Sequence, residues 1–70
     1  MALSAAQTAE AKARAIEYLE YSTYSLSLML GVDLADVSAS WTIPVAADAD
    51  DYNAHDCLKK QVVVLTALKA

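Results

Sequence analysis

The sequence predicts an all-α fold, a two-helix antiparallel hairpin with a long, partly extended connection. One segment rich in alanine begins at a capping pattern and ends at the only glycine of the chain. A second segment with apolar residues at helical spacing follows a group of acids and ends near a lysine. The chain has 70 residues, so we expect one small domain covering residues 1–70.

The first helix is expected over about residues 4–30. Ser4 and Gln7 have the spacing of a capping box, in which two side chains satisfy two backbone N–H groups at the helix start. Alanine, the best helix former, is frequent in the turns that follow. Gly31 lies where the end of a helix favours a left-handed residue.

The connection is expected over residues 31–47. Asp33 can cap one short helical turn. The segment after this turn is expected to be extended, because Ile43 precedes a proline and is disfavoured in the helical region. So long a connection needs anchors, and Trp41, Ile43 and Val45 are the apolar side chains placed to provide them.

The second helix is expected over residues 48–69. Asp48, Asp50 and Asp51 crowd its first turn and Lys69 lies in its last turn, an arrangement that the helix dipole favours. Its apolar face is expected to comprise Ala54, Cys57, Leu58, Gln61, Val64, Leu65 and Leu68.

A β-branched run in the second helix leaves an alternative fold open. Residues 61–66 would also suit a buried strand, which would pair with residues 41–45 in a small α+β fold. The length of the periodic segment and its flanking residues favour the helix.

The first helix is expected to carry two apolar faces. The face expected to pack on the second helix comprises Ala5, Ala9, Ile16, Leu19, Leu26 and Leu30, with Lys12 and Thr23 as interruptions. Tyr18, Tyr21 and Tyr24 recur every three residues on another side, where Leu28 and Met29 continue the row. The single interior of a hairpin cannot cover both faces. The tyrosines therefore either pack beneath the connection or form a docking surface, and we favour the surface.

The distribution of charge supports a docking surface. Residues 21–32 and 37–47 contain no Asp, Glu, Lys, Arg or His. The cores of protein–protein interfaces are depleted of charge in this way. The expected partner is a protein or a further copy of the chain, and the expected partner-binding residues are Tyr18, Tyr21, Tyr24, Leu28, Met29, Trp41 and Ile43.

Charge and hydropathy argue against other partners. The net charge is −4, whereas direct nucleic-acid binding needs clustered Lys and Arg. No segment has the roughly 20 mostly apolar residues of a membrane span, and the first residues lack the features of a secretion signal. With Cys57 as the only cysteine, we expect an intracellular protein, made in the cytoplasm and available for incorporation into a larger particle.

The residues with catalytic or ligand chemistry form no recognisable motif. Asp51 and His55 can share a helix face, but Cys57 lies about 200° from His55 around the helix. His55 is expected at the surface beside an aspartate. In a calcium loop starting at the acidic cluster, Asn53 and Lys59 would replace the required Gly and Glu. We therefore expect no enzyme activity, no metal and no cofactor.

These patterns predict a non-enzymatic structural or assembly subunit. It would dock on copies of itself or on a larger complex through its uncharged, Tyr-rich helical surface. Minor structural components of virus particles are short, motif-free chains of this class, so a virion is one such assembly. The alternative is a small acidic inhibitor or regulator that binds a basic surface of another protein, with an affinity that falls as salt rises.

Overall fold

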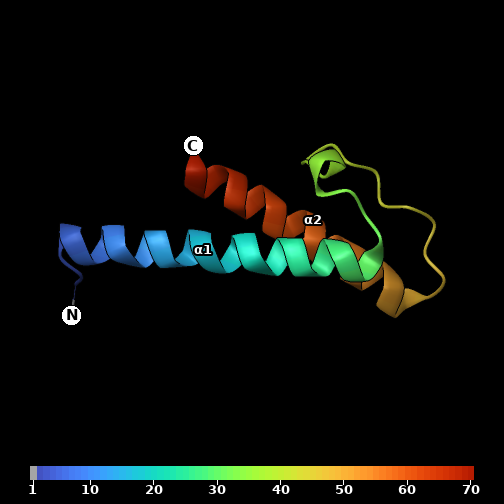
Figure 1. Ribbon diagram of the computed structural model, residues 1–70, viewed down its shortest axis with the longest axis horizontal. Coiled ribbons are helices and arrows are strands. Elements are labelled where there is room, and N and C mark those ends of the chain that lie inside the picture. Colours follow the sequence, from blue (N-terminus) through green and yellow to red (C-terminus); the bar gives the residue numbers. More distant parts are fainter. Residues whose placement is uncertain (1) are drawn as a thin grey trace.

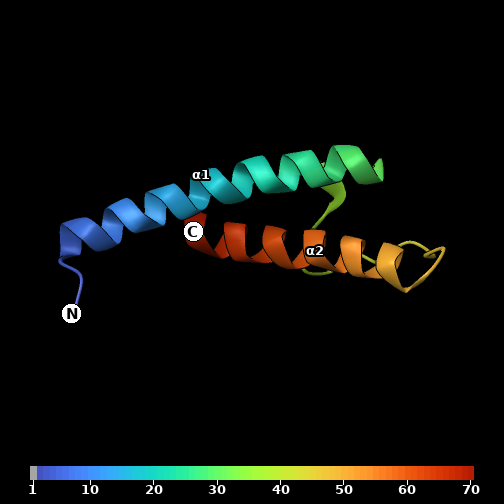
Figure 2. The ribbon, with the colours of Figure 1, turned by 90° about the horizontal axis from the view of Figure 1, so that it is seen from below.

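The computed structural model describes residues 2–70 as two antiparallel α-helices joined by a long connection (Figures 1 and 2). Helix α1 spans Ala5–Leu30, a single 3-10 turn η1 spans Leu34–Asp36, and helix α2 spans Ala49–Lys69. No β-strand occurs in residues 2–70. The predicted all-α hairpin is therefore confirmed.

The α+β alternative is wrong, because residues 61–66 lie inside α2. The hydroxyl of Thr66 donates to the carbonyl of Val62 at 2.8 Å, a bond to the preceding helical turn. Residues 41–45 have no regular secondary structure and offer no strand for pairing. The helix context before and after the β-branched run thus outweighs the strand preference of the valines.

The ends of α1 have the predicted caps. The backbone N–H of Gln7 donates to Ser4 Oγ at 3.1 Å, and the N–H of Ser4 donates to Gln7 Oε1 at 2.9 Å. At the other end Gly31 has φ 67°, a left-handed conformation that costs glycine little. This turn lets the N–H of Val32 donate to the carbonyl of Ser27 at 3.0 Å.

Helix α2 begins one residue later than expected, because Asp48 is its N-cap. Asp48 Oδ1 accepts from the N–H of Asp51 at 2.8 Å. Asp51 in turn accepts from the N–H of Ala47 through Oδ2 at 3.0 Å. The acidic cluster therefore satisfies N–H groups at the helix start, where the dipole also favours negative charge.

The two helices share a narrow interior. Leu58 of α2 and Thr23 of α1 are fully buried, and Ser27 is nearly so. Half-buried apolar residues on the two helices include Ile16, Leu19, Leu26, Leu30, Ala54, Val62, Leu65 and Leu68. Ser22 Oγ also donates to Gln61 Oε1 across the helix pair at 2.7 Å.

Thr23 is part of this interior, so its description as an interruption of the packing face is wrong. Its hydroxyl donates to the carbonyl of Leu19 at 2.7 Å and approaches that of Glu20 at 3.2 Å. A hydroxyl that bonds within its own helix can be buried without leaving a polar group unsatisfied.

The N-terminal part of α1 extends beyond α2 (Figure 2). Near the end of α2, Lys69 Nζ lies 3.7 Å from Glu20 Oε1, some fifteen positions from the start of α1. All of residues 2–14 are exposed. Ala5 and Ala9 therefore do not pack on α2 as predicted, because the second helix is too short to reach them.

The connection packs against α2. Val37 is buried, and residues 37–39 share a small hollow with Val62, Val63 and Thr66. The indole of Trp41 stacks on the imidazole of His55, with ring centroids 6.2 Å apart. Trp41 is thus an anchor, as predicted.

Val45 is not an anchor, because its side chain is completely exposed. It follows Pro44 in the connection, which loops out past the end of the hairpin (Figure 1). The connection is held through Val37 and Trp41 instead, both of which lie before the proline.

The buried face of α2 is rotated from the predicted one. Cys57 is exposed and Val64 is 50% exposed, so neither belongs to the interior. His55 is buried instead, with 8% of its surface exposed, so its predicted place at the surface is wrong. The rotation arises because α2 packs against both α1 and the connection, and the connection covers the side that carries His55 and Val62.

The hairpin is elongated for its size. Its Cα radius of gyration is 14.2 Å, whereas a compact chain of this length has about 11 Å. Its accessible surface is 5017 Å², against about 4,200 Å² for a compact monomer of the same mass. Only Val37 and Leu58 are buried apolar residues in the described chain. The fold thus leaves much apolar surface in contact with water.

Candidate protein-binding surface

The tyrosine face of α1 consists of Tyr18, Tyr21, Tyr24, Leu28 and Met29. These side chains are 69%, 74%, 58%, 64% and 81% exposed, respectively. The interpretation that the tyrosines pack beneath the connection is therefore wrong. The connection packs on α2 through Val37 and Trp41 and leaves these five side chains exposed.

Two serines form a hollow within the tyrosine face. Ser22 and Ser25 line a depression of about 280 Å³, walled by Tyr18, Tyr21, Leu26 and Met29. Large side chains on both sides of small ones produce a surface with protrusions and a recess. Sequence analysis missed these serines, although each lies four residues from Tyr18, Tyr21 or Met29 and so shares a side of the helix with them.

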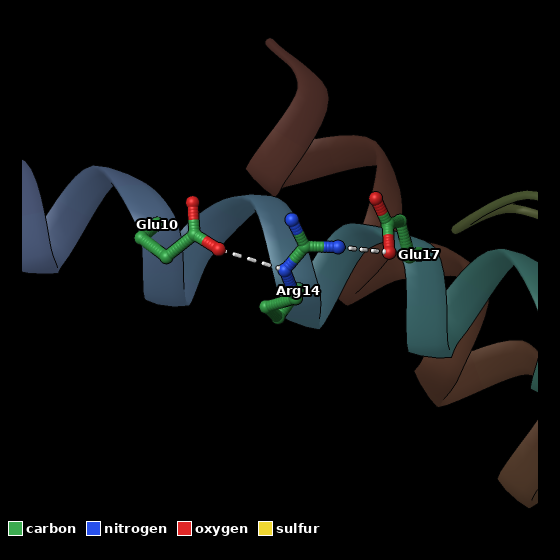
Figure 3. A network of polar contacts seen from close by, with 3 residues as sticks. All are labelled: Glu10, Arg14 and Glu17. Carbon is green, nitrogen blue, oxygen red and sulfur yellow. Dashed lines mark hydrogen bonds and ion pairs between the residues drawn. The ribbon is translucent and has the colours of Figure 1, made fainter.

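Charged residues border this surface at its N-terminal end. Arg14 Nε donates to Glu10 at 2.9 Å and Arg14 Nη1 donates to Glu17 at 2.7 Å (Figure 3). The hydrogen bond that Arg14 donates to Glu10, with the charge of Glu17, raises the pKa of the Arg14 guanidinium. The three side chains neutralise part of one another's charge, and the uncharged segment of α1 begins at Tyr21.

Of the two predicted partner-binding residues of the connection, Trp41 lies apart from the tyrosine face. Trp41 is half-buried and stacked on His55 of α2, and Ile43 is half-buried as well. The structure therefore brings together Tyr18, Tyr21, Tyr24, Leu28 and Met29, whereas Trp41 lies on α2. A role for these two residues in partner binding stays a prediction.

The residues with ligand chemistry are engaged in the fold. His55 Nδ1 lies 2.8 Å from the carbonyl oxygen of Asp51 and 3.5 Å from its Oδ1. Cys57 Sγ accepts from Gln61 Nε2 at 3.3 Å on a different side of α2. Among residues 2–70, no three His, Cys, Asp or Glu side chains are grouped so that they could hold a metal ion.

A smaller patch lies on the outer side of α2. Val63 and Val64 are 39% and 50% exposed and share a shallow depression with Asp56, Lys59 and Lys60. Lys60 Nζ forms an ion pair with Asp56 Oδ2 at 2.8 Å, and this hydrogen bond raises the pKa of Lys60. With its charges, this patch resembles an ordinary helix surface more than the uncharged tyrosine face does.

Neither helix of the described chain has the length and apolar composition needed to cross a membrane. Comparison of the chain with known protein families, curated proteins and solved structures found no match.

Proposed function

We propose that this protein is a non-enzymatic structural or assembly subunit that docks on other protein chains through the tyrosine face of α1. The observation that carries the proposal is the exposure of three tyrosines, a leucine and a methionine on one side of one helix. Aromatic residues and Met are enriched at protein interfaces. Tyr in particular combines a large apolar area with a hydroxyl that remains useful in a partly wet contact.

The absence of charge from this surface supports the same function. The segment 21–32 contains no ionisable Asp, Glu, Lys, Arg or His, although the whole chain carries nine acids and five bases. Charged groups are costly to bury in the core of an interface, and their depletion there is a common compositional signal. The charged residues stand at the border, where Arg14 is paired with Glu10 and Glu17.

The small interior of the hairpin supports it as well. Two buried apolar residues provide little hydrophobic stabilisation for a chain of 70 residues. Docking of a partner on the tyrosine face would remove further apolar area from water and stabilise the folded chain by mass action.

Site-specific photo-crosslinking in the native source tests this proposal. A benzophenone amino acid replaces Tyr21 in the tyrosine face, and in a matched control it replaces Tyr52, a 48% exposed tyrosine on α2. We expect a discrete protein adduct from position 21 and much weaker crosslinking from position 52. Equal crosslinking at both positions, or none at position 21, would overturn the proposal.

Salt dependence distinguishes this function from that of an acidic inhibitor. Docking through an uncharged apolar surface changes little between about 0.05 and 0.5 M salt, because screening acts on charges. An inhibitor that used its net charge of −4 to bind a basic surface would lose most of its affinity over the same range. The yield of the position 21 adduct at the two salt concentrations measures the difference.

A further inference from the structure

We propose that the partner of the tyrosine face is a second copy of this chain, with the two α1 helices antiparallel and Tyr21 of each copy seated at Ser25 of the other. This inference rests on the proposed function and specifies its partner. It follows from the spacing of the exposed residues, the position of the hollow, the charge distribution and the area available.

The exposed side of α1 has the spacing of a coiled-coil seam. Tyr18, Tyr21, Ser25 and Leu28 follow one another at intervals of three, four and three residues. This alternation places side chains along one stripe that can meet an equivalent stripe on another helix. The buried Thr23 lies on the side that faces α2, so the stripe and the hairpin interior use different sides of α1.

Antiparallel pairing matches large side chains to small ones. The seam of a coiled coil has two alternating kinds of position, here Tyr18 and Ser25 of one kind and Tyr21 and Leu28 of the other. In an antiparallel pair, each kind on one helix meets the other kind on the partner helix. Tyr21 then lies opposite Ser25 of the second copy, and Tyr18 lies opposite its Leu28. The hollow of about 280 Å³ that Ser25 lines receives the phenol ring. Parallel pairing would instead place Ser25 against Ser25 and leave this hollow unfilled.

Charge makes this face suited to self-association. In a two-fold symmetric dimer each surface meets its own copy, so any charged patch is brought toward an identical one. The chain has a net charge of −4, yet the stripe from Tyr18 to Leu28 carries no charge. Glu20, the one ionisable acid within that range, lies near Lys69 of α2 and away from the stripe. The tyrosine face can therefore meet itself without like-charge repulsion at its centre.

The area of the face is that of a stable dimer. Given the exposed fractions of its five side chains and about 200 Å² for each when fully exposed, the face offers about 700 Å² per copy. A standard specific interface buries about 800 Å² per partner. The excess of accessible surface over that of a compact monomer is of the same size.

Sedimentation equilibrium of the purified chain tests the pairing. We expect twice the chain mass of 7.5 kDa at micromolar concentration. Ser25→Glu places a charge where Tyr21 of the second copy is seated and should weaken the dimer at least about 100-fold. Ala13→Glu, which adds the same charge at an exposed position outside the stripe, should leave the dimer intact. Circular dichroism of both variants checks that each one remains helical.

A distance between spin labels tests the orientation. In a Cys57→Ser background, Ala9→Cys places a label on the exposed part of α1 beyond α2. Antiparallel pairing with Tyr21 opposite Ser25 separates the two labels by about 40 Å along the axis, at 1.5 Å per residue. Parallel pairing brings them within about 20 Å. Pulsed electron–electron double resonance measures the distance between the labels, and a value near 20 Å would overturn the proposal.

These measurements separate this inference from the proposed function. A helical monomer at about 100 μM, or a dimer that Ser25→Glu leaves unchanged, would overturn self-pairing. The crosslink from position 21 would still support docking if its adduct contained another protein. An adduct of twice the chain mass, together with a dimer that Ser25→Glu dissociates, supports both.

Discussion

The two sides of α1 differ in the size of their side chains and in what those side chains contact. The side facing α2 has serine, threonine and half-buried aliphatic residues such as Leu19 and Leu26, and its most buried members are Thr23 and Ser27. The outer side carries three tyrosines, a leucine and a methionine, all more than half exposed. All three aromatic groups of α1 are thus outside the interior of its own fold. A face of this kind is better explained by an intermolecular contact than by the stability of a single hairpin.

The buried hydroxyls show how the inner side can be polar and still be packed. Thr23 donates to the carbonyl of Leu19, and Ser27 Oγ donates to the carbonyl of Tyr24 at 2.7 Å. Their side chains are short and satisfied within α1, so they leave room for the close approach of α2. The inner side of α1 therefore contributes close packing against α2, whereas the outer side presents a large apolar area to solvent.

The largest expected effect of a substitution is on the inner side. Leu58→Ala removes a fully buried side chain and should lower the free energy of unfolding by about 3 kcal/mol. The matched outer variant, Leu28→Ala, should cost less than about 0.5 kcal/mol under conditions where the chain is monomeric. Urea unfolding followed by circular dichroism at low concentration measures both. Equal losses would contradict the contrast between the two sides.

The next effect concerns the connection. Trp41→Ala removes the ring stacked on His55 and should cost about 2 kcal/mol, because the indole is half-buried. Val45→Ala alters a completely exposed side chain and should leave the unfolding midpoint unchanged. Thermal unfolding compares the two variants. A loss at Val45 as large as that at Trp41 would show that the connection is held differently.

A smaller effect is expected at the end of α1. Gly31→Ala should cost about 1 kcal/mol, because φ is 67° and a left-handed backbone is unfavourable for alanine. Steric crowding does not contribute, since no atom lies within 4 Å of an added Cβ. Gly31→Asn should cost less than Gly31→Ala, because asparagine tolerates this conformation better. Chemical unfolding of the three proteins would rank them, and the reverse order of Ala and Asn would refute this explanation.

The smallest effect is expected at the border of the tyrosine face. Arg14→Gln removes both ion pairs of the network, but the arginine side chain is 63% exposed. We expect no measurable change in the unfolding midpoint, since exposed pairs contribute little. A large drop in the midpoint would show that the network stabilises the fold as well as bordering the surface.

The sequence predicts the ends of the helices well because local chemistry determines them. Ser4 with Gln7, Gly31 and Asp48 act through neighbours a few residues away, and each caps a helix end within one residue of its predicted place. The exposure of Tyr21 and its neighbours also follows from a simple argument about a hairpin with one interior.

The errors concern contacts between distant segments. Cys57 and His55 exchange their predicted environments because the connection packs on one side of α2, and helical periodicity carries no information about that packing. Thr23 was expected to interrupt a face that it helps to form, because a hydroxyl bonded to its own helix behaves as a small buried group. The sequence does not indicate that Ser25 lines a hollow, because the hollow depends on the positions of the larger side chains around it.

The overhang of α1 beyond α2 has a consequence for local opening of the helix. Residues 5–14 are exposed and rely on alanine content, the Ser4–Gln7 cap and ion pairs rather than on packing. Helical segments of this length are marginal in water when nothing packs on them. Amide hydrogens should therefore exchange with solvent rapidly near Ala5 and progressively more slowly toward Thr23, so that one continuous helix contains a gradient of protection.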